Sequence, residues 1–365
     1  MNIADKILAK DELSREDIIN LLLTTDEDER LSLFNKAKYT TQKYSGSKVN
    51  LRGLIELSNI CKKNCYYCGI RAGNKDTERY LLNSAHAMEA AEYAWKKGFG
   101  SVVIQSGERQ DKAFTRHITD LITQIKTLSN QELGITLSCG EQSEDVYREW
   151  FEAGAHRYLL RVETSSPELY RKLHPNDDLH DFERRIEALK SLQKVGFQTG
   201  TGVMIGLPYQ SVEHLADDLI FMKNLNIDMA GMGPYVPHPD TPLFYHSEDI
   251  PEDTRRLDLS LKMIALLRIM MKDINIAAST ALNTLDPNGR VKAVAAGANV
   301  FMPNVTPPAQ ASNYMLYEGK PIFTDTAETA LVEFEEHIQD LGFTINYNML
   351  GDSKHYHNRI AKKGL

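Results

Sequence analysis

The chain contains 365 residues, 42% of them hydrophobic and 25% charged, the ordinary balance of a globular protein with a large core, which excludes disordered and collagen-like chains. Lys and Arg number 42 against 50 Asp and Glu, and the net charge of −8 makes nucleic acid and anionic membranes poor partners. Barrels of alternating strands and helices often reach this length as one unit.

The N-terminal residues lack the basic start and apolar core of a signal peptide, and no stretch approaches a membrane span of about 20 apolar residues. Three of the four cysteines lie within eight residues, which does not resemble the disulfide framework of a secreted protein. We therefore expect a cytoplasmic protein.

Residues 1–48 are predicted to form a helical extension. Ser14 precedes Asp17 and a run of apolar residues, a pattern typical of a capped helix start, and residues 31–44 form a second helical segment. We expect these helices to close the lower face of the domain that follows.

Residues 49–310 alternate between short apolar runs and longer amphipathic segments, as in a parallel sheet covered by helices. Glycines that suit left-handed helix caps follow several of these segments, at Gly98, Gly154 and Gly196. Eight predicted strands imply an α/β fold, a (βα)8 TIM barrel with its active site at the carboxyl ends of the strands. The strands are expected at residues 51–58, 101–105, 135–139, 157–163, 200–206, 228–233, 275–280 and 299–303, and the main helices at residues 85–97, 115–128, 182–195, 212–225 and 254–271.

Residues 311–365 are predicted to be a C-terminal segment that packs on the barrel. A helix is expected at residues 329–341, followed from Asp352 by a polar, loosely ordered tail.

The loop after the first strand carries Cys61, Cys65 and Cys68. Thiolates are the ligands that iron–sulfur clusters prefer, and three of them leave the fourth iron of a 4Fe-4S cluster open for chemistry. A structural zinc site needs four protein ligands, and neither a second CxxC nor a suitably spaced His pair lies nearby. Cys139, the remaining cysteine, is expected to be a small buried hydrophobe.

This CxxxCxxC motif, with Tyr67 before the last cysteine, resembles the signature of the radical S-adenosylmethionine (SAM) superfamily. Further segments, from about Tyr44 to Gly319, resemble its biotin synthase-like subgroup, and in particular the family of FeFe-hydrogenase maturases HydE. They include LRGLIELSN before the cysteines, CGIRAGNK after them, and the later QSGE, VMIGLPYQ and GANVFMPN.

The resemblance implies two cofactors, one 4Fe-4S cluster held by the three cysteines and SAM. SAM binding is then expected from Tyr67, Gln105, Ser106, Gly107, Glu108, Arg161, Glu163, Arg185, Gly206 and Leu207. The substrate cavity is expected to be lined by Arg52, Ser279, Thr280, Tyr314 and Tyr317.

Each role has a structural alternative. Arg161 and Glu163 share one face of a strand and could simply pair with each other, while Arg185 could be a solvated helix residue. Tyr314 and Tyr317 could be packing aromatics. Gly206 could simply be the glycine that a turn requires. His238, between two prolines, is expected to be a turn residue.

The resemblance further implies reductive cleavage of SAM to a 5′-deoxyadenosyl radical, which would process a cysteine-bound iron carbonyl cyanide precursor in assembly of the hydrogenase H-cluster. Expected partners are a small organometallic or amino-acid-derived substrate, an external electron donor and other hydrogenase maturases. Two alternatives stay open, a methylornithine synthase-like mutase and a non-catalytic iron–sulfur scaffold. Biotin synthase chemistry needs further cysteines for a second cluster, and residues 320–331 lack the cysteines of an accessory cluster.

Overall fold

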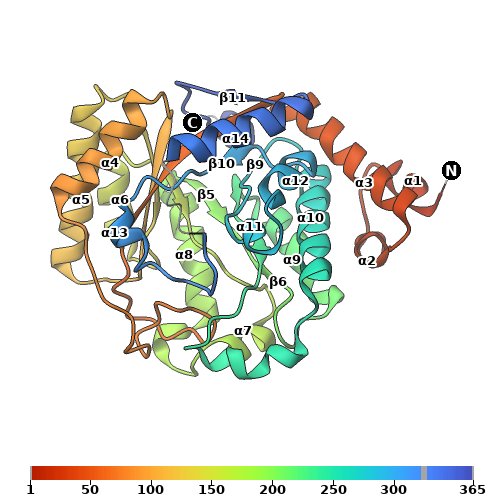
Figure 1. Ribbon diagram of the computed structural model, residues 1–365, viewed down its shortest axis with the longest axis horizontal. Coiled ribbons are helices and arrows are strands. Elements are labelled where there is room, and N and C mark those ends of the chain that lie inside the picture. The colour runs from red at the N-terminus through yellow and green to blue at the C-terminus, as the bar shows by residue number, and fades with distance from the viewer. Residues whose placement is uncertain (1, 322–326, 364–365) are drawn as a thin grey trace.

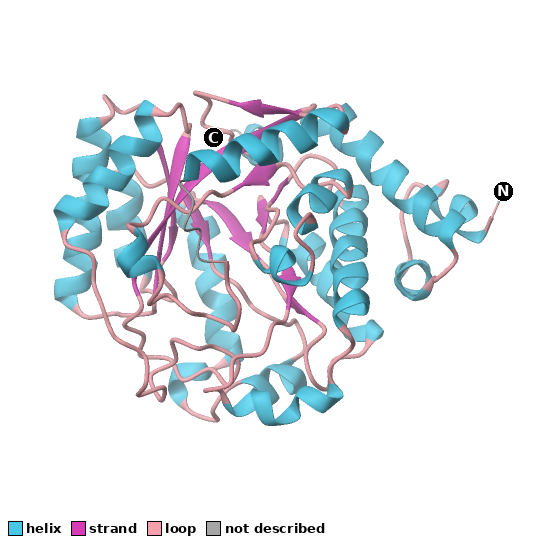
Figure 2. Cartoon of the chain, in the orientation of Figure 1, coloured by secondary structure: helices cyan, strands magenta, loops and turns pink. Residues whose placement is uncertain are grey.

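The computed structural model describes residues 2–321 and 327–363. Parallel strands form a sheet in the order β10-β1-β2-β3-β4-β5-β7-β9, with helices outside it (Figures 1 and 2). A parallel bridge between Ala277 and Val300 joins the two edges. The predicted eight-stranded α/β barrel is thereby confirmed, with bounds β1 (Lys48–Ser58), β2 (Ser101–Ser106), β3 (Gly134–Ser138), β4 (Arg157–Leu159), β5 (Gln198–Thr201), β7 (Met229–Ala230), β9 (Asn275–Ile276) and β10 (Val300–Phe301).

The two faces of β1 show how the sequence builds the barrel wall. Val49, Leu51 and Ile55 alternate along the strand and belong to the apolar core beneath the surrounding helices. Because side chains alternate across a strand, Arg52 and Glu56 point the other way, toward the inside of the barrel. The interior thus contains charged groups.

Several strands are shorter than the sequence predicts. The expected strand 200–206 divides into β5 and β6 (Met204–Ile205), and the strand 228–233 divides into β7 and β8 (Gly233–Pro234). At the break, a Cβ on Gly202 would lie 2.0 Å from the carbonyl oxygen of Gly231. The two backbones therefore approach too closely for a regular ladder with side chains.

The covering helices follow the predicted segments. Asn83 and Asp111 cap the helices that flank β2 with side-chain oxygens, and Gly196 ends α8 with a φ of +116°, as its position predicted. The helices are α4 (Ser84–Lys96), α5 (Lys112–Leu128), α6 (Glu144–Glu152), α7 (Pro167–Leu173), α8 (Phe182–Val195), α9 (Val212–Leu225), α10 (Asp253–Met270), α11 (Ala281–Leu285), α12 (Gly289–Ala295), α13 (Pro308–Ala311), α14 (Ala327–Asp340) and α15 (Lys354–Lys363).

The N-terminal helices are α1 (Ile3–Leu8), α2 (Arg15–Leu23) and α3 (Glu27–Thr40), and Ser14 caps α2 as predicted, in a capping box with Asp17. They contact α9 and α10 on the outside of the barrel (Figure 1). The prediction that they close the lower face is wrong, because Ile18 and Leu21 bury their side chains in the apolar cluster of those outer helices.

The C-terminal segment instead closes this end of the barrel, where the strands begin. β11 (Thr344–Asn346) pairs with β1, and the Asp352 carboxylate accepts a 2.8 Å hydrogen bond from the buried guanidinium of Arg157. Arg359 of α15 pairs with Asp228. The prediction of a loosely ordered tail is therefore wrong. The tail is held against the barrel because it supplies partners for buried charges there.

The imidazole of His156 beside this closure makes stability depend on pH. Burial, and then the charge of Arg157, lower the pKa of His156 to about 4, against about 6.5 in an unfolded chain. Between these values the unfolded chain binds the proton more readily. We therefore expect the contribution of His156 to be complete above about pH 6.5 and to fall by about 3 kcal/mol as the pH drops toward 4.

Denaturant unfolding at pH 7 and pH 5 checks this expectation. His156→Gln should lose less stability between the two pH values than the wild type does. Equal losses would show that the proton is taken up elsewhere.

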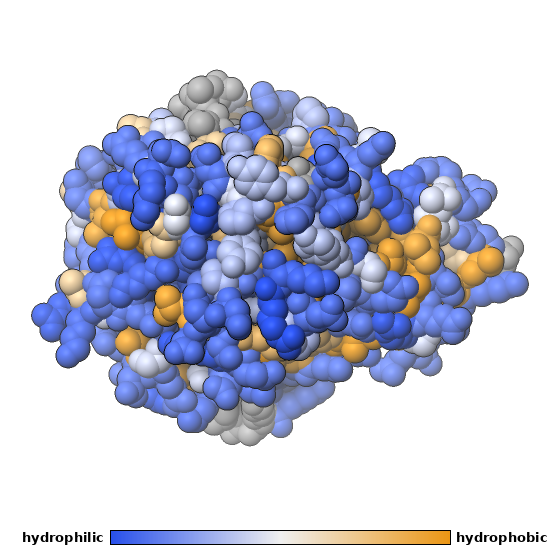
Figure 3. Space-filling model, turned by 90° about the horizontal axis from the view of Figure 1, so that it is seen from below, coloured by the Kyte–Doolittle hydropathy of each residue, from blue (hydrophilic) through white to orange (hydrophobic). Residues whose placement is uncertain are grey.

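No helix among residues 2–321 and 327–363 is long and apolar enough to cross a membrane. Seen from below, the surface is mainly hydrophilic, with apolar side chains in scattered patches (Figure 3).

Candidate active site

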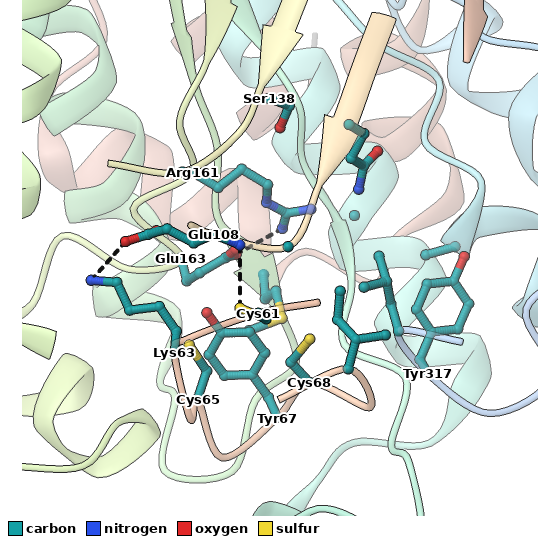
Figure 4. A pocket seen from close by; sticks show the side chains of 18 of the residues that line it. Cys61, Lys63, Cys65, Tyr67, Cys68, Glu108, Ser138, Arg161, Glu163 and Tyr317 are labelled. Atoms are coloured by element: carbon teal, nitrogen blue, oxygen red, sulfur yellow. Dashed lines mark hydrogen bonds and ion pairs between the residues drawn. The ribbon is translucent and has the colours of Figure 1, made fainter. Parts of the chain in front are cut away.

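A cavity of about 250 Å³ lies at the carboxyl ends of the barrel strands, where the fold predicts the active site. The loop after β1 forms one wall of the cavity, and the ends of β2, β4 and β8 form others. Residues 314–317, which we call the strap, contribute Tyr314, Leu316 and Tyr317 to the lining. Figure 4 shows the sulfur atoms of Cys61, Cys65 and Cys68 together beneath Arg161 and Glu163. The structure thus brings together residues that are up to 256 positions apart, from Cys61 to Tyr317.

The cysteine loop is held against the end of β2. The backbone N–H of Glu108 donates to Cys61 Sγ at 3.3 Å, and the backbone N–H of Lys62 donates to the Glu108 carbonyl. A Cβ on Gly107 would lie 2.5 Å from the carbonyl oxygen of Ile60, so only glycine permits this contact. The QSGE segment therefore positions the first thiol.

The glycine after Cys68 has a similar role on the opposite side. A Cβ on Gly69 would lie 2.5 Å from the ring of His238 and 2.2 Å from the Met315 carbonyl oxygen. His238 is buried, and its Nδ1 accepts a hydrogen bond from the backbone of Asp240. It is a turn residue, as predicted, and it also supports the cysteine loop.

The donor set fits a three-thiolate cluster site. Burial raises the pKa of Cys61, raises that of Cys65 to about 12 and raises that of Cys68 well above its usual value, so a bound metal would displace the protons of these thiols. Within the described chain, no three His, Cys, Asp or Glu side chains converge enough to hold one metal ion. A 4Fe-4S cluster binds its thiolates through different irons, so it does not require them to converge on one point.

The side chains of Arg161 and Glu163 form an ion pair at 2.9 Å, as one of the two interpretations of the sequence predicted. Both residues also line the cavity, as the other interpretation requires. Glu163 has a φ of +67°, a left-handed conformation that is costly for a residue with a side chain and that concentrates at functional sites. Arg161 Nε and Ser279 Oγ are buried and lack a hydrogen-bond partner among the described residues. These atoms suit a polar ligand such as SAM.

A buried ion network, which we define as Lys63, Glu108, Glu141 and Arg185, lies beside the cysteines. Lys63 Nζ contacts Glu141 at 3.0 Å and Glu108 at 3.2 Å, while Arg185 contacts Glu141 and lies 3.6 Å from Glu108. Burial opposes the charge of Glu141, but Arg185 and Lys63 hold the pKa of its carboxyl below the usual value. Arg185 is therefore no solvated helix residue.

Lys63 and Glu141 were missed in the sequence analysis. Lys63 lies inside the cysteine motif, at a position that the motif leaves unspecified. Glu141 follows Gly140, whose φ of +75° marks a turn directly after β3. A charged residue immediately after a barrel strand was the available signal.

Most of the predicted site residues line the cavity, and four do not. Arg52 is buried deeper in the barrel, where its guanidinium contacts Met229 Sδ and the Gly351 carbonyl. The backbone N–H groups of Gly206 and Leu207 donate to the side chain of Gln210, and Thr280 precedes α11. The lining residues are Cys61, Cys65, Tyr67, Cys68, Gln105, Ser106, Gly107, Glu108, Arg161, Glu163, Arg185, Ser279, Tyr314 and Tyr317.

Cys139 is fully buried, and burial raises the pKa of its thiol to about 11. It packs in the core between the barrel and its helices, as expected for a small apolar residue.

A (βα)8 barrel with a three-cysteine loop after its first strand defines a radical SAM enzyme, which uses a 4Fe-4S cluster and SAM. The profile of the Radical SAM superfamily matches residues 55–222. The FeFe hydrogenase maturase subunit HydE of Thermotoga maritima is 42% identical over 314 residues, 86% of each chain. The chain therefore belongs to the HydE family of radical SAM proteins.

More distant relatives share the fold. A 3-methylornithine synthase of Methanosarcina acetivorans is 27% identical over 81% of each chain. A crystal structure of methylornithine synthase superimposes with a TM-score of 0.79 at 22% identity, covering 95% of this chain and 98% of that one. The hydrogenase maturase HydG gives the same TM-score at 20% identity, covering 99% and 80%.

Proposed function

We propose that this protein is a hydrogenase maturase, which processes a cysteine-bound iron carbonyl cyanide precursor of the H-cluster. The proposal includes an external electron donor, other hydrogenase maturases as partners and a cytoplasmic location. The HydE relative, 42% identical over most of both chains, supports it.

The residues have distinct roles in this proposal. Cys61, Cys65 and Cys68 would hold the cluster, and a reduced cluster at this position would supply the electron for cleavage of SAM to methionine and a 5′-deoxyadenosyl radical. Arg161 and Arg185 offer cations to the SAM carboxylate, a stronger interaction than a neutral hydrogen bond. The strap residues exclude water, so that the radical meets the substrate rather than solvent.

The charge of the cavity is the observation that carries the substrate assignment. Its described lining contains three cations, Lys63, Arg161 and Arg185, and two carboxylates, those of Glu108 and Glu163. Each carboxylate lies within ion-pair distance of a cation. A lysine-like substrate needs a free carboxylate for its ammonium, and the described lining offers none, because Glu108, Glu163 and the adjoining Glu141 are all paired with these cations.

Incubation of the reduced, cluster-loaded enzyme with SAM and a cysteine-bound iron carbonyl cyanide complex tests the function. We expect the infrared bands of the bound carbonyl and cyanide groups to shift and 5′-deoxyadenosine to accumulate. Cys139→Ala should behave like the wild type.

The same assay with L-lysine separates the alternatives. Conversion of L-lysine to methylornithine, without a response to the iron complex, would favour the mutase. A cluster-loaded protein that produces no 5′-deoxyadenosine under either condition would indicate a scaffold.

A further inference from the structure

His174 lies against the aromatic residue of the cysteine motif. It directly follows α7, and its imidazole meets the Tyr67 ring edge to face, with the ring centroids 5.4 Å apart. The Tyr67 hydroxyl lies 3.3 Å from His174 Nε2. The cysteine loop is fixed to the same helix end, because the backbone N–H of Tyr66 donates to the Leu173 carbonyl at 2.9 Å. The backbone therefore sets the position of both rings.

The other ring nitrogen of His174 determines the direction of the contact with Tyr67. Nδ1 lies 2.8 Å from the carbonyl oxygen of Tyr170, and a carbonyl oxygen can only accept a hydrogen bond, so Nδ1 carries the proton. Burial lowers the pKa of His174 to about 3, so the imidazole is neutral and its Nε2 can only accept. The Tyr67 hydroxyl therefore donates its single proton to His174.

The same hydroxyl lies beside one of the three cysteines of the loop. Figure 4 shows it next to the sulfur of Cys65. Burial raises the pKa of the Cys65 thiol, whereas Arg185 and the Tyr67 side chain, which is within hydrogen-bonding reach, lower it. A phenol has one proton, so a hydroxyl that donates to His174 cannot donate to this sulfur. Without an acceptor at position 174, the proton would turn to the Cys65 thiolate.

A hydrogen bond to a cysteine sulfur changes the reduction potential of an iron–sulfur cluster. The donor stabilises the negative charge that the sulfur gains when the cluster is reduced, and so it raises the potential. Reductive cleavage of SAM requires a low potential, because a sulfonium accepts an electron only from a strong reductant. A donor on Cys65 would therefore weaken the driving force for the reaction.

We infer that His174 is a positioning residue that withholds the Tyr67 hydroxyl proton from Cys65 and thereby keeps the reduction potential of the bound cluster low. It acts through Tyr67 and requires no contact of its own with cofactor or substrate. Its role concerns the cofactor that the whole superfamily shares, so it is independent of the maturase assignment.

His174→Phe tests this role, because phenylalanine keeps an aromatic ring where the imidazole stacks on Tyr170, at 3.9 Å between centroids, and lacks the acceptor nitrogen. A redox titration of the cluster-loaded protein, followed by electron paramagnetic resonance, measures the potential. We expect the ratio of reduced to oxidised cluster at a fixed potential to rise roughly tenfold, equal to a positive shift of about 59 mV for a one-electron couple. The iron content should stay that of the wild type, since the three cysteines are intact.

Tyr67 supplies the matched control. Tyr67→Phe removes the hydroxyl, so its potential should stay close to that of the wild type, and His174→Phe should cause no further shift in this background. A shift of equal size in both backgrounds would show a merely structural effect of His174 and would overturn the inference. His174→Gln, whose amide oxygen can accept the Tyr67 proton, should restore the wild-type potential.

A measurement on the wild type keeps the inference open to refutation if His174→Phe does not fold. In the cluster-free full chain with isotope-labelled histidine, nuclear magnetic resonance reports which ring nitrogen carries the proton, and comparison with His174→Gln assigns the signals. We expect His174 to be protonated at Nδ1 alone at neutral pH. A proton on Nε2 would leave the Tyr67 proton available to Cys65, and that result would also overturn the role of His174.

Discussion

Single replacement of Cys61, Cys65 or Cys68 by Ala is expected to abolish cluster binding. The wild type, purified without oxygen, should carry about four irons and four sulfides per chain, since three thiolates and one open iron site define the cluster. Two thiolates cannot hold it, because no other cysteine among the described residues lies in the cavity lining. Iron and sulfide analysis and the electron paramagnetic resonance of the reduced protein measure the loss.

Cys139→Ala is the matched control, because it removes a thiol of the same chain from the apolar core. Its iron content should equal that of the wild type. Stoichiometric zinc in the wild type, or a second cluster signal, would contradict the three-cysteine site.

Replacement of Glu141 by Ala should produce the largest loss of stability among the charged residues of the site. It leaves Lys63 and Arg185 buried with Glu108 as their shared carboxylate, and breaking a buried pair in this way costs about 3–5 kcal/mol. The free energy of unfolding of the cluster-free protein measures this effect. SAM affinity of the cluster-loaded variant should fall as well, because Arg185 loses the partner that orients it.

Glu144→Ala is the control on the neighbouring helix. Glu144 pairs with Arg148 and Lys194 at the surface, where solvent screens the charges and such pairs contribute little to stability. If Glu141→Ala is as mild as Glu144→Ala, the buried ion network does not organise the site.

The sequence predicted the barrel well because its strands and helices are encoded by local patterns. Ser14 and Gly196 mark helix ends through side-chain capping and backbone freedom, which neighbouring residues determine. The cysteine loop is likewise a local motif. The N-terminal helices were misplaced because an amphipathic pattern shows which face is buried, but not against which partner.

How far along the barrel axis an inward side chain lies was harder to predict from the sequence. Arg52 and Glu56 lie on the same face of β1, and four residues of strand separate them by about 13 Å. Alternation places Arg52 inside the barrel, yet it does not show that its side chain lies near the lower end, beside Gly351. The buried ion pair of Glu56 and Lys320 was missed for a related reason, since a pair across 264 residues has no local signature.

The closure of the barrel by its C-terminal segment has a consequence for protein synthesis. β1 can pair with β2 early, but its other partners, β10 and β11, follow about 250 and 300 residues later in the chain. On the ribosome, the first strand therefore remains an unpaired edge on one side until nearly the whole barrel has been translated. Its inward charges Arg52 and Glu56 discourage edge-to-edge association during that interval, so the residues that define the finished interior also protect the nascent chain.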